Sequence, residues 1–169
     1  MTQPTPERVF PEIGRLAGID FGTVRIGVAI CDPGRTISSP LATYVRGNRE
    51  ADAKYFRRLA SEEQLVGFVI GLPVLASGDE SAKSQEVRRF ADWLASVTAL
   101  PYCLYDERYT TVQAGEMLRM GEMRGKRRKQ RLDMLAAQIL LASYLESPRS
   151  HARGAMPLDE SDQPRADLE

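Results

Sequence analysis

One short run constrains the fold of this chain more than any other feature. The segment LVGFVIGL, residues 65–72, holds eight consecutive residues without a polar side chain. A run that is apolar at both odd and even positions is typical of a strand covered on both faces of its sheet. Because that cover comes from helices, the run predicts an α/β fold with helices on both faces.

The segments around this run fit the same architecture. Three strand candidates precede it: RLAGID and RIGVAIC, joined by FGTV, and PLATYV after the turn DPGR. LPYCLYDE is a fifth. We expect a mixed five-stranded sheet, in which three antiparallel meander strands are followed by two parallel strands. The helices that spacing and position predict cover residues 49–64, 80–96, 110–120 and 131–146.

The ends of the chain differ in composition from its middle. Residues 1–13 hold three prolines and predict a loose leader, and residues 147–169 hold five acids and three arginines and predict a disordered acidic tail. Residues 14–146 then form one globular domain. There is no run of about 18 apolar residues and no apolar signal segment, so we expect a cytoplasmic protein without a membrane partner.

Two cysteines and one histidine narrow the chemistry. Cys31 and Cys103 lie in apolar, strand-like runs, which favours two buried reduced thiols over a disulfide. His151 is the only histidine and lies in the polar tail. Catalysis by histidine and histidine-rich metal sites are therefore not expected.

Three carboxylates stand where folding does not require them. Asp20 ends the first strand, Glu107 follows the fifth strand, and Asp133 lies in the last predicted helix. At helical spacing Asp133 shares a face with Ala137 and Leu140, so it points inward, where an unpaired charge is costly. Because open α/β sheets place their sites at the carboxyl ends of their strands, we expect the three acids to converge at that edge.

Each acid also has an interpretation without catalysis. Asp20 could form a turn, Glu107 could make a surface salt bridge with Arg108, and Asp133 could stabilise the N-terminal dipole of its helix. These explanations work one at a time. Three carboxylates that meet at one edge would repel one another unless a cation joined them.

The cation that this set of ligands suits is Mg²⁺ or Mn²⁺, because all three ligands are hard oxygens and no Cys/His spacing suggests zinc. Carboxylates and a substrate phosphate together can hold two such ions about 3.5–4 Å apart. One ion lowers the pKa of a bound water and the other stabilises the leaving 3′-oxygen. The pattern therefore predicts metal-dependent hydrolysis of phosphodiester bonds.

The net charge of zero hides a basic segment next to Asp133. Residues 119–131 hold seven basic residues and one acid. The run KRRKQR, residues 126–131, follows Gly125 and predicts a mobile loop before the last helix. This loop would either grip a nucleic-acid backbone with little sequence readout or be a solvated charged loop. Its candidate substrate-binding residues are Lys126, Arg127, Arg128 and Lys129.

Residues after the fourth and fifth strands offer further phosphate contacts. Thr110 and Thr111 either cap the helix that follows or contact phosphate through hydroxyls and helix N-terminal amides. We also assign Arg108 to substrate binding. Asp106 is interpreted as a supporting or surface residue, and Lys83 as either a substrate contact or a solvated lysine at a helix start.

Four blocks of the sequence, taken together, resemble the YqgF/RuvX family, which has a ribonuclease H-like fold. They are GIDFGTVRIGVAICDP, VIGLPVLASGDESAKS, YDERYTT and KRRKQRLDMLAAQILLASYL. The match runs from about residue 16 to residue 145, and the order and spacing of the blocks make it specific. By motif position, the three acids of the family fall on Asp20, Glu107 and Asp133.

Members of this family are described as pre-16S rRNA nucleases and as relatives of RuvC Holliday-junction resolvases. The resemblance implies a cytoplasmic, Mg²⁺-dependent endonuclease in 5′-end maturation of 16S rRNA, with structured RNA or ribosomal precursor particles as partners. Branched DNA is the alternative substrate. The fourth acid of RuvC-type resolvases falls on Ala136 here, which favours general nuclease chemistry over junction resolution.

Two other functions fit parts of the chain. GIDFGT also resembles the first phosphate motif of the actin, Hsp70 and sugar-kinase ATPases, but those proteins duplicate the core and need a second phosphate motif, which this sequence lacks. A non-catalytic RNA-binding factor in ribosome assembly would keep the fold. The presence of all three acids argues against such a loss of catalysis.

Overall fold

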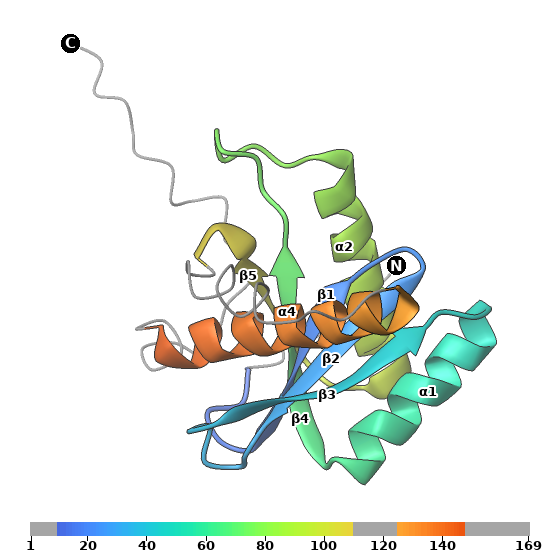
Figure 1. The fold of residues 1–169 in the computed structure, drawn as a ribbon. Coiled ribbons are helices and arrows are strands. Elements are labelled where there is room, and N and C mark those ends of the chain that lie inside the picture. The colour runs from blue at the N-terminus through green and yellow to red at the C-terminus, as the bar shows by residue number, and fades with distance from the viewer. Residues whose placement is uncertain (1–9, 110–124, 148–169) are drawn as a thin grey trace, which may run out of the picture.

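The structure is a computed structural model of the chain and describes residues 10–109 and 125–147. Within these ranges one sheet has the strand order β3-β2-β1-β4-β5 (Figure 1). β1 pairs antiparallel with β2, and β2 with β3, while β1–β4 and β4–β5 are parallel. The predicted mixed sheet is confirmed. The strands are β1 (Arg15–Phe21), β2 (Arg25–Cys31), β3 (Ser38–Val45), β4 (Leu65–Leu72) and β5 (Tyr102–Asp106).

Helices cover both faces of this sheet, as predicted. α1 (Arg49–Glu62) and α2 (Ala82–Thr98) lie on one face, and α4 (Lys126–Glu146) crosses β1, β2 and β3 on the other (Figure 1). A single 3-10 turn, η1 (Glu107–Tyr109), follows β5. The helix predicted over 110–120 lies outside the described residues. None of the helices within the described ranges combines the length and the apolar character that crossing a bilayer requires.

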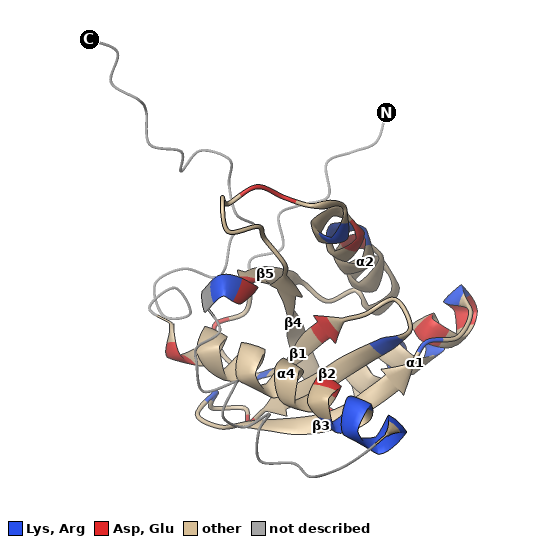
Figure 2. Cartoon of the chain, turned by 45° about the horizontal axis from the view of Figure 1, so that its top comes forward, with Lys and Arg blue, Asp and Glu red and all other residues tan. Residues whose placement is uncertain are grey.

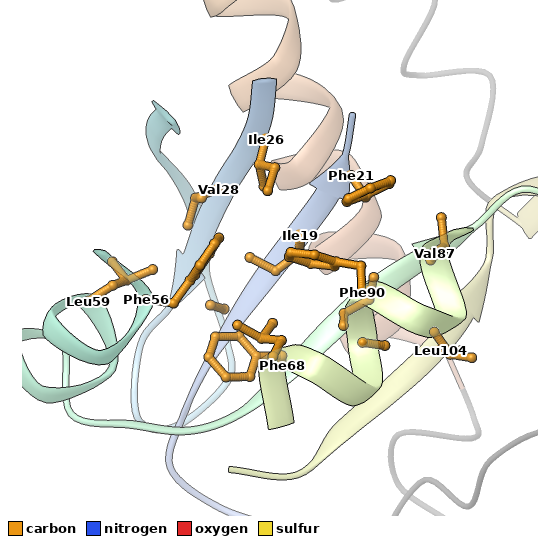
Figure 3. Close-up of a cluster of buried hydrophobic side chains, with 14 of the residues drawn as sticks. Ile19, Phe21, Ile26, Val28, Phe56, Leu59, Phe68, Val87, Phe90 and Leu104 are labelled. Atoms are coloured by element: carbon orange, nitrogen blue, oxygen red, sulfur yellow. The ribbon is translucent and has the colours of Figure 1, made fainter. Parts of the chain in front are cut away.

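β4 is apolar at every position because its two faces serve two cores. Phe68 and Ile70 point into the larger core, under α1 and α2, where they meet Phe56 and Phe90 (Figure 3). Val69 points the other way, into a smaller core under α4. The strand is therefore covered on both faces, as its sequence predicts.

α4 begins earlier than the sequence analysis predicts. The run KRRKQR forms its first turns, directly after Gly125, so the prediction of a loop there is wrong. Lys, Arg and Gln are good helix formers, and the Thr43 hydroxyl of β3 donates to the carbonyl of Gln130, which holds this end of α4 on the sheet. Asp133 is then the eighth residue of α4, beyond the first turn in which the helix dipole acts. The dipole explanation of Asp133 is therefore wrong.

Two features of the smaller core, Phe10 and the two cysteines, bear on predictions made from the sequence. Phe10 belongs to the predicted leader, yet it is buried and lies edge-on to Tyr144 of α4, with 6.2 Å between ring centroids. Cys31 and Cys103 are both buried and free, as predicted, and burial raises the pKa of both thiols.

Candidate active site

The candidate active site lies at the carboxyl end of the central strand. Asp20 is the penultimate residue of β1, which has β4 on one side and β2 on the other. Alternate residues of a strand point to opposite faces. Because Ile19 and Phe21 pack under α1 and α2, Asp20 points to the face that α4 covers. Figure 2 shows acidic residues at the ends of β1 and β5, on the same edge of the sheet.

Two glycines let α4 bring Asp133 to this edge. Gly27 of β2 is the cross-strand partner of Asp20. A Cβ atom at position 27 would lie 2.0 Å from the backbone oxygen of Asp133, so α4 rests directly on β2 there. Gly18 has the same role a helical turn further along, where a Cβ would lie 2.8 Å from the backbone oxygen of Ala137. Only glycine permits so close an approach, and it places Asp133 beside Asp20.

A third glycine makes room for Glu107. Glu107 is the first residue after β5, and β4 separates β5 from β1. A Cβ atom on Gly71 of β4 would lie 2.8 Å from Glu107 Oε1. The Glu107 side chain therefore lies across the end of β4, in the direction of Asp20.

The pKa of Asp20 responds to the charges of the other two acids. The pKa of Asp20 rises from 3.8 to about 7, mainly through burial and then through the charges of Glu107 and Asp133, while Lys83 opposes the rise. Burial also raises the pKa of Glu107, with Lys83 opposing and Asp106 adding to the rise. The structure thus brings Asp20, Glu107 and Asp133 to one sheet edge, where their charges repel.

Lys83 adds a positive charge from the start of α2. Ser81 caps this helix in a reciprocal pair with Ser84, and the Ser84 hydroxyl donates to the carbonyl of Pro73 in the loop after β4. Lys83 is exposed, yet its charge lowers the pKa of both Asp20 and Glu107. It therefore acts on the site, which the sequence alone left open.

Arg25 is a site residue that the sequence analysis missed. Its Nε donates to Asp133 Oδ2 at 2.8 Å, and both side chains are partly buried. The sequence carried a usable signal, because Arg25 and Gly27 are alternate residues of β2 and so face the same side. The ion pair neutralises Asp133 and holds its carboxylate toward β2.

Arg108 is bound by the carboxylate that precedes Glu107. Its Nη2 donates to Asp106 Oδ2 at 2.6 Å and its Nε donates to the same oxygen at 2.9 Å. Asp106 is buried at the end of β5, so it acts as a supporting residue. The Arg108 side chain remains 41% exposed, which leaves it accessible to a substrate at this edge.

The basic run lies on the same helix as Asp133. Lys126, Arg127, Arg128 and Lys129 are all exposed, in the first turn of α4 rather than on a loop. Figure 2 shows basic residues gathered at this end of the helix. The helix therefore fixes the backbone positions of these residues relative to Asp133. Thr110 and Thr111, the other predicted substrate contacts, lie outside the described residues.

The chemistry of the three acids fits a hard divalent cation, because all are carboxylates whose repulsion a cation would relieve. Their present arrangement is not yet that of a metal centre. Among the residues that the structure describes, no group of three or more His, Cys, Asp or Glu side chains is close enough to hold an ion. Oδ2 of Asp133 is instead paired with Arg25.

Comparison of the sequence with known families and proteins gives consistent matches. The profile of the RuvX family, described as Holliday junction resolvase, matches residues 14–147. A protein of Rhodopirellula baltica named "Putative pre-16S rRNA nuclease" is 51% identical over 148 residues, which are 88% of this chain and 86% of the relative. A protein of Koribacter versatilis with the same name is 38% identical over 133 residues, 79% of this chain and 87% of that one.

Comparison of the fold with solved structures agrees. The RuvC protein of Thermus thermophilus, solved in complex with a Holliday junction substrate, matches with a TM-score of 0.50 at 16% identity. The match covers 78% of this chain and 94% of RuvC. It bears out the ribonuclease H-like fold expected from the sequence. Since the family profile spans most of the chain and a relative is 51% identical, the chain belongs to the RuvX family.

Proposed function

We propose that this protein is a metal-dependent endonuclease that hydrolyses phosphodiester bonds in RNA, with the precursor of 16S rRNA as its substrate. The observation that supports the proposal is the burial of Asp20 at a sheet edge next to Glu107 and Asp133, which together raise its pKa to about 7. The names of the relatives support the choice of substrate.

The three acids would hold Mg²⁺ or Mn²⁺, which supplies an activated water and stabilises the leaving 3′-oxygen when substrate is bound. Asp20 is the central ligand, because its pKa responds to both of the other acids. Arg25 and Lys83 place positive charge around the acids. If Asp133 bound the ion in place of Arg25, the Arg25 guanidinium would be available to bind a substrate phosphate with its planar fork.

Substrate binding outside the acids falls to exposed cations. The first turn of α4 presents Lys126, Arg127, Arg128 and Lys129 on the helix that carries Asp133. Such contacts follow the nucleic-acid backbone and depend on salt rather than on sequence. We assign the same role to Arg108, Thr110 and Thr111 at the η1 end of the site.

The experiment that tests this proposal is a cleavage assay in Mg²⁺ and in Mn²⁺ on a 16S rRNA precursor with an extended 5′ end. Asp20→Asn and Asp133→Asn should abolish cutting and retain RNA binding, because they remove metal ligands and keep the shape of the side chains. Glu62→Gln is the matched control. It neutralises an exposed acid at the last residue of α1 and should cut like the wild type.

A second candidate function is resolution of DNA junctions, which the description of the family and the RuvC match favour. A four-way DNA junction in the same assay separates the two. Cutting of the junction but not of the RNA would replace the rRNA proposal. A wild-type protein that binds RNA and cuts neither substrate would instead be a non-catalytic assembly factor.

A further inference from the structure

A pocket opens on the opposite face of the same sheet edge. Its volume is about 640 Å³, and it lies among the β1–β2 turn, the start of α1 and α2. Phe21 is the next residue after Asp20 and points into this pocket, away from α4. The walls combine three arginines with three aromatic rings, namely Arg46, Arg49, Arg89, Phe21, Phe90 and Trp93.

Arg46 is fixed in this pocket by a buried carboxylate. Asp52 is 1% exposed and accepts from the Tyr44 hydroxyl at 2.8 Å, the Gly47 backbone N–H at 2.9 Å and Arg46 Nε at 3.2 Å. The bond to Arg46 uses Nε, so it leaves the two terminal nitrogens for a ligand. A cation held in this way needs little ordering when a ligand binds.

The guanidinium of Arg46 also lies over two aromatic rings. Its central carbon lies 5.3 Å from the centroid of the Phe21 ring and 5.9 Å from that of Phe90. These two rings lie side by side, 4.7 Å apart (Figure 3). The cation–π contact stabilises the position of Arg46 and keeps it partly out of water. Arg46 is therefore a preformed anchor rather than a mobile surface side chain.

The charge of the pocket favours an anion. Arg49 and Arg89 are exposed at its rim, and Glu86 is the one exposed acid among its lining residues. Asp52, the other acid, is buried and already bound to Arg46. Trp93 adds a partly buried aromatic surface. Phe21 and Phe90 are buried under Arg46, so Trp93 is the lining ring that a base can reach. Arginines for a phosphate next to an aromatic ring for a base are what proteins use to bind unpaired nucleotides.

We propose that this pocket binds an unpaired nucleotide of the RNA substrate, adjacent to the bond held at the three acids. The inference rests on the proposed nuclease function and adds a structural preference to it. Successive strand residues are about 3.3 Å apart, so a chain lying over Asp20 reaches the pocket by crossing the tip of β1. A duplex keeps its bases stacked inside, so only an unpaired nucleotide can fill the pocket.

Trp93 provides a direct test, because it is the only tryptophan of the chain and lines the pocket. The full-length protein is titrated, without divalent metal, with a single-stranded oligoribonucleotide of about eight nucleotides and with the matching duplex. The single strand should change the Trp93 fluorescence, and the duplex should leave it unchanged. An equal response to both would overturn the proposal.

Two sets of variants locate the response. Arg49→Ala with Arg89→Ala removes two exposed rim cations and should weaken single-strand binding by about fivefold or more. Arg46→Lys keeps the charge next to Asp52, so the fold is retained, but it loses the planar fork and should also weaken binding. Lys54→Ala with Arg58→Ala is the matched control, because it removes the same charge from exposed positions elsewhere on α1.

If the rim variant binds the single strand as well as the control variant does, the pocket is not a nucleotide site. Because the titration uses no metal, its outcome is independent of cleavage. Loss of the Trp93 response with intact cutting would overturn the pocket alone. An intact response in a protein that does not cut would overturn the nuclease proposal alone.

Discussion

Asp20 is held in the fold at a cost in stability. Burial and two neighbouring acids raise its pKa to about 7 in the folded state, against 3.8 ordinarily. A raised acid pKa means that the folded protein binds the proton more tightly than the unfolded chain. The carboxyl group therefore does not lower the free energy of unfolding below about pH 4, and it lowers it by the full amount above about pH 7. An acid whose replacement would stabilise the fold is typical of a functional site.

The first prediction follows from the raised pKa of Asp20. Asp20→Asn should raise the free energy of unfolding by about 1–4 kcal/mol above pH 7, and the gain should vanish as the pH falls toward 4. Urea unfolding at several pH values measures it. Asp32→Asn is the opposite control, because hydrogen bonds from Ile37 and Thr36 lower the pKa of Asp32, and the variant should lose stability at neutral pH. A loss of stability in Asp20→Asn at high pH would contradict the account.

Arg25 carries the second prediction at this scale. In this structure Arg25 forms an ion pair with Asp133, and the positive charge of Arg25 repels a metal cation. Arg25→Ala should therefore tighten Mn²⁺ binding by the protein alone, by a few-fold, since a partly exposed ion pair is worth about 0–1 kcal/mol. Calorimetric titration measures this affinity. Weaker Mn²⁺ binding would show that Arg25 supports the ion site instead of competing for it.

At the scale of elements, the site depends on how closely α4 lies on the sheet. Gly27 has no room for a side chain, because a Cβ would lie 2.0 Å from the backbone of Asp133. Gly27→Ala must push α4 away from β2, which should cost about 1–3 kcal/mol of stability and separate Asp133 from Asp20. Thermal unfolding and the cleavage assay should both show the loss.

Gly34→Ala, in the turn between β2 and β3, is the control for this helix displacement. A Cβ there meets the end of the Asp32 side chain at 3.1 Å and, beyond the two neighbouring residues, no backbone atom within 4 Å. It should leave cleavage unchanged. Full activity in Gly27→Ala would mean that the contact between α4 and β2 does not set the geometry of the site.

The first turn of α4 is the second element that can be tested. Replacing Lys126, Arg127, Arg128 and Lys129 by Ala keeps a good helix former at each position. Each phosphate contact contributes about 0.7–0.9 to the slope of log K against log salt, so the slope should become shallower. RNA binding at several salt concentrations measures it. The Lys54→Ala, Arg58→Ala variant should keep the wild-type slope, and an unchanged slope in the α4 variant would remove this turn from the binding surface.

At the scale of the whole molecule, the candidate active site and the pocket lie at one edge of the sheet, on opposite faces. The acids and Arg25 lie on the face that α4 covers, and the pocket around Arg46 lies on the face of α1 and α2. β1 contributes to both, through Asp20 on one side and Phe21 on the other. A nucleic-acid strand that crosses the tip of β1 would meet both.

The sequence predicted those features of this arrangement that depend on the local pattern of apolar and polar residues. The apolar character of β4 indicated the covered sheet, and the inward position of Asp133 on its helix pointed to the site. The start of α4, the Arg25–Asp133 pair and the Asp52–Arg46 anchor were missed, since each depends on contacts between distant segments. Periodicity reports which face is buried, but register decides which polar side chains meet there.

The measurement that tests the central claim most directly is the anomalous diffraction of Mn²⁺ in crystals soaked above the Asp20 pKa of about 7, where this carboxyl group is ionised. The account predicts Mn²⁺ density bound by Asp20 together with Glu107 and Asp133, with Arg25 no longer paired to Asp133. Empty density at this edge, with the Arg25–Asp133 pair intact at saturating Mn²⁺, would contradict it.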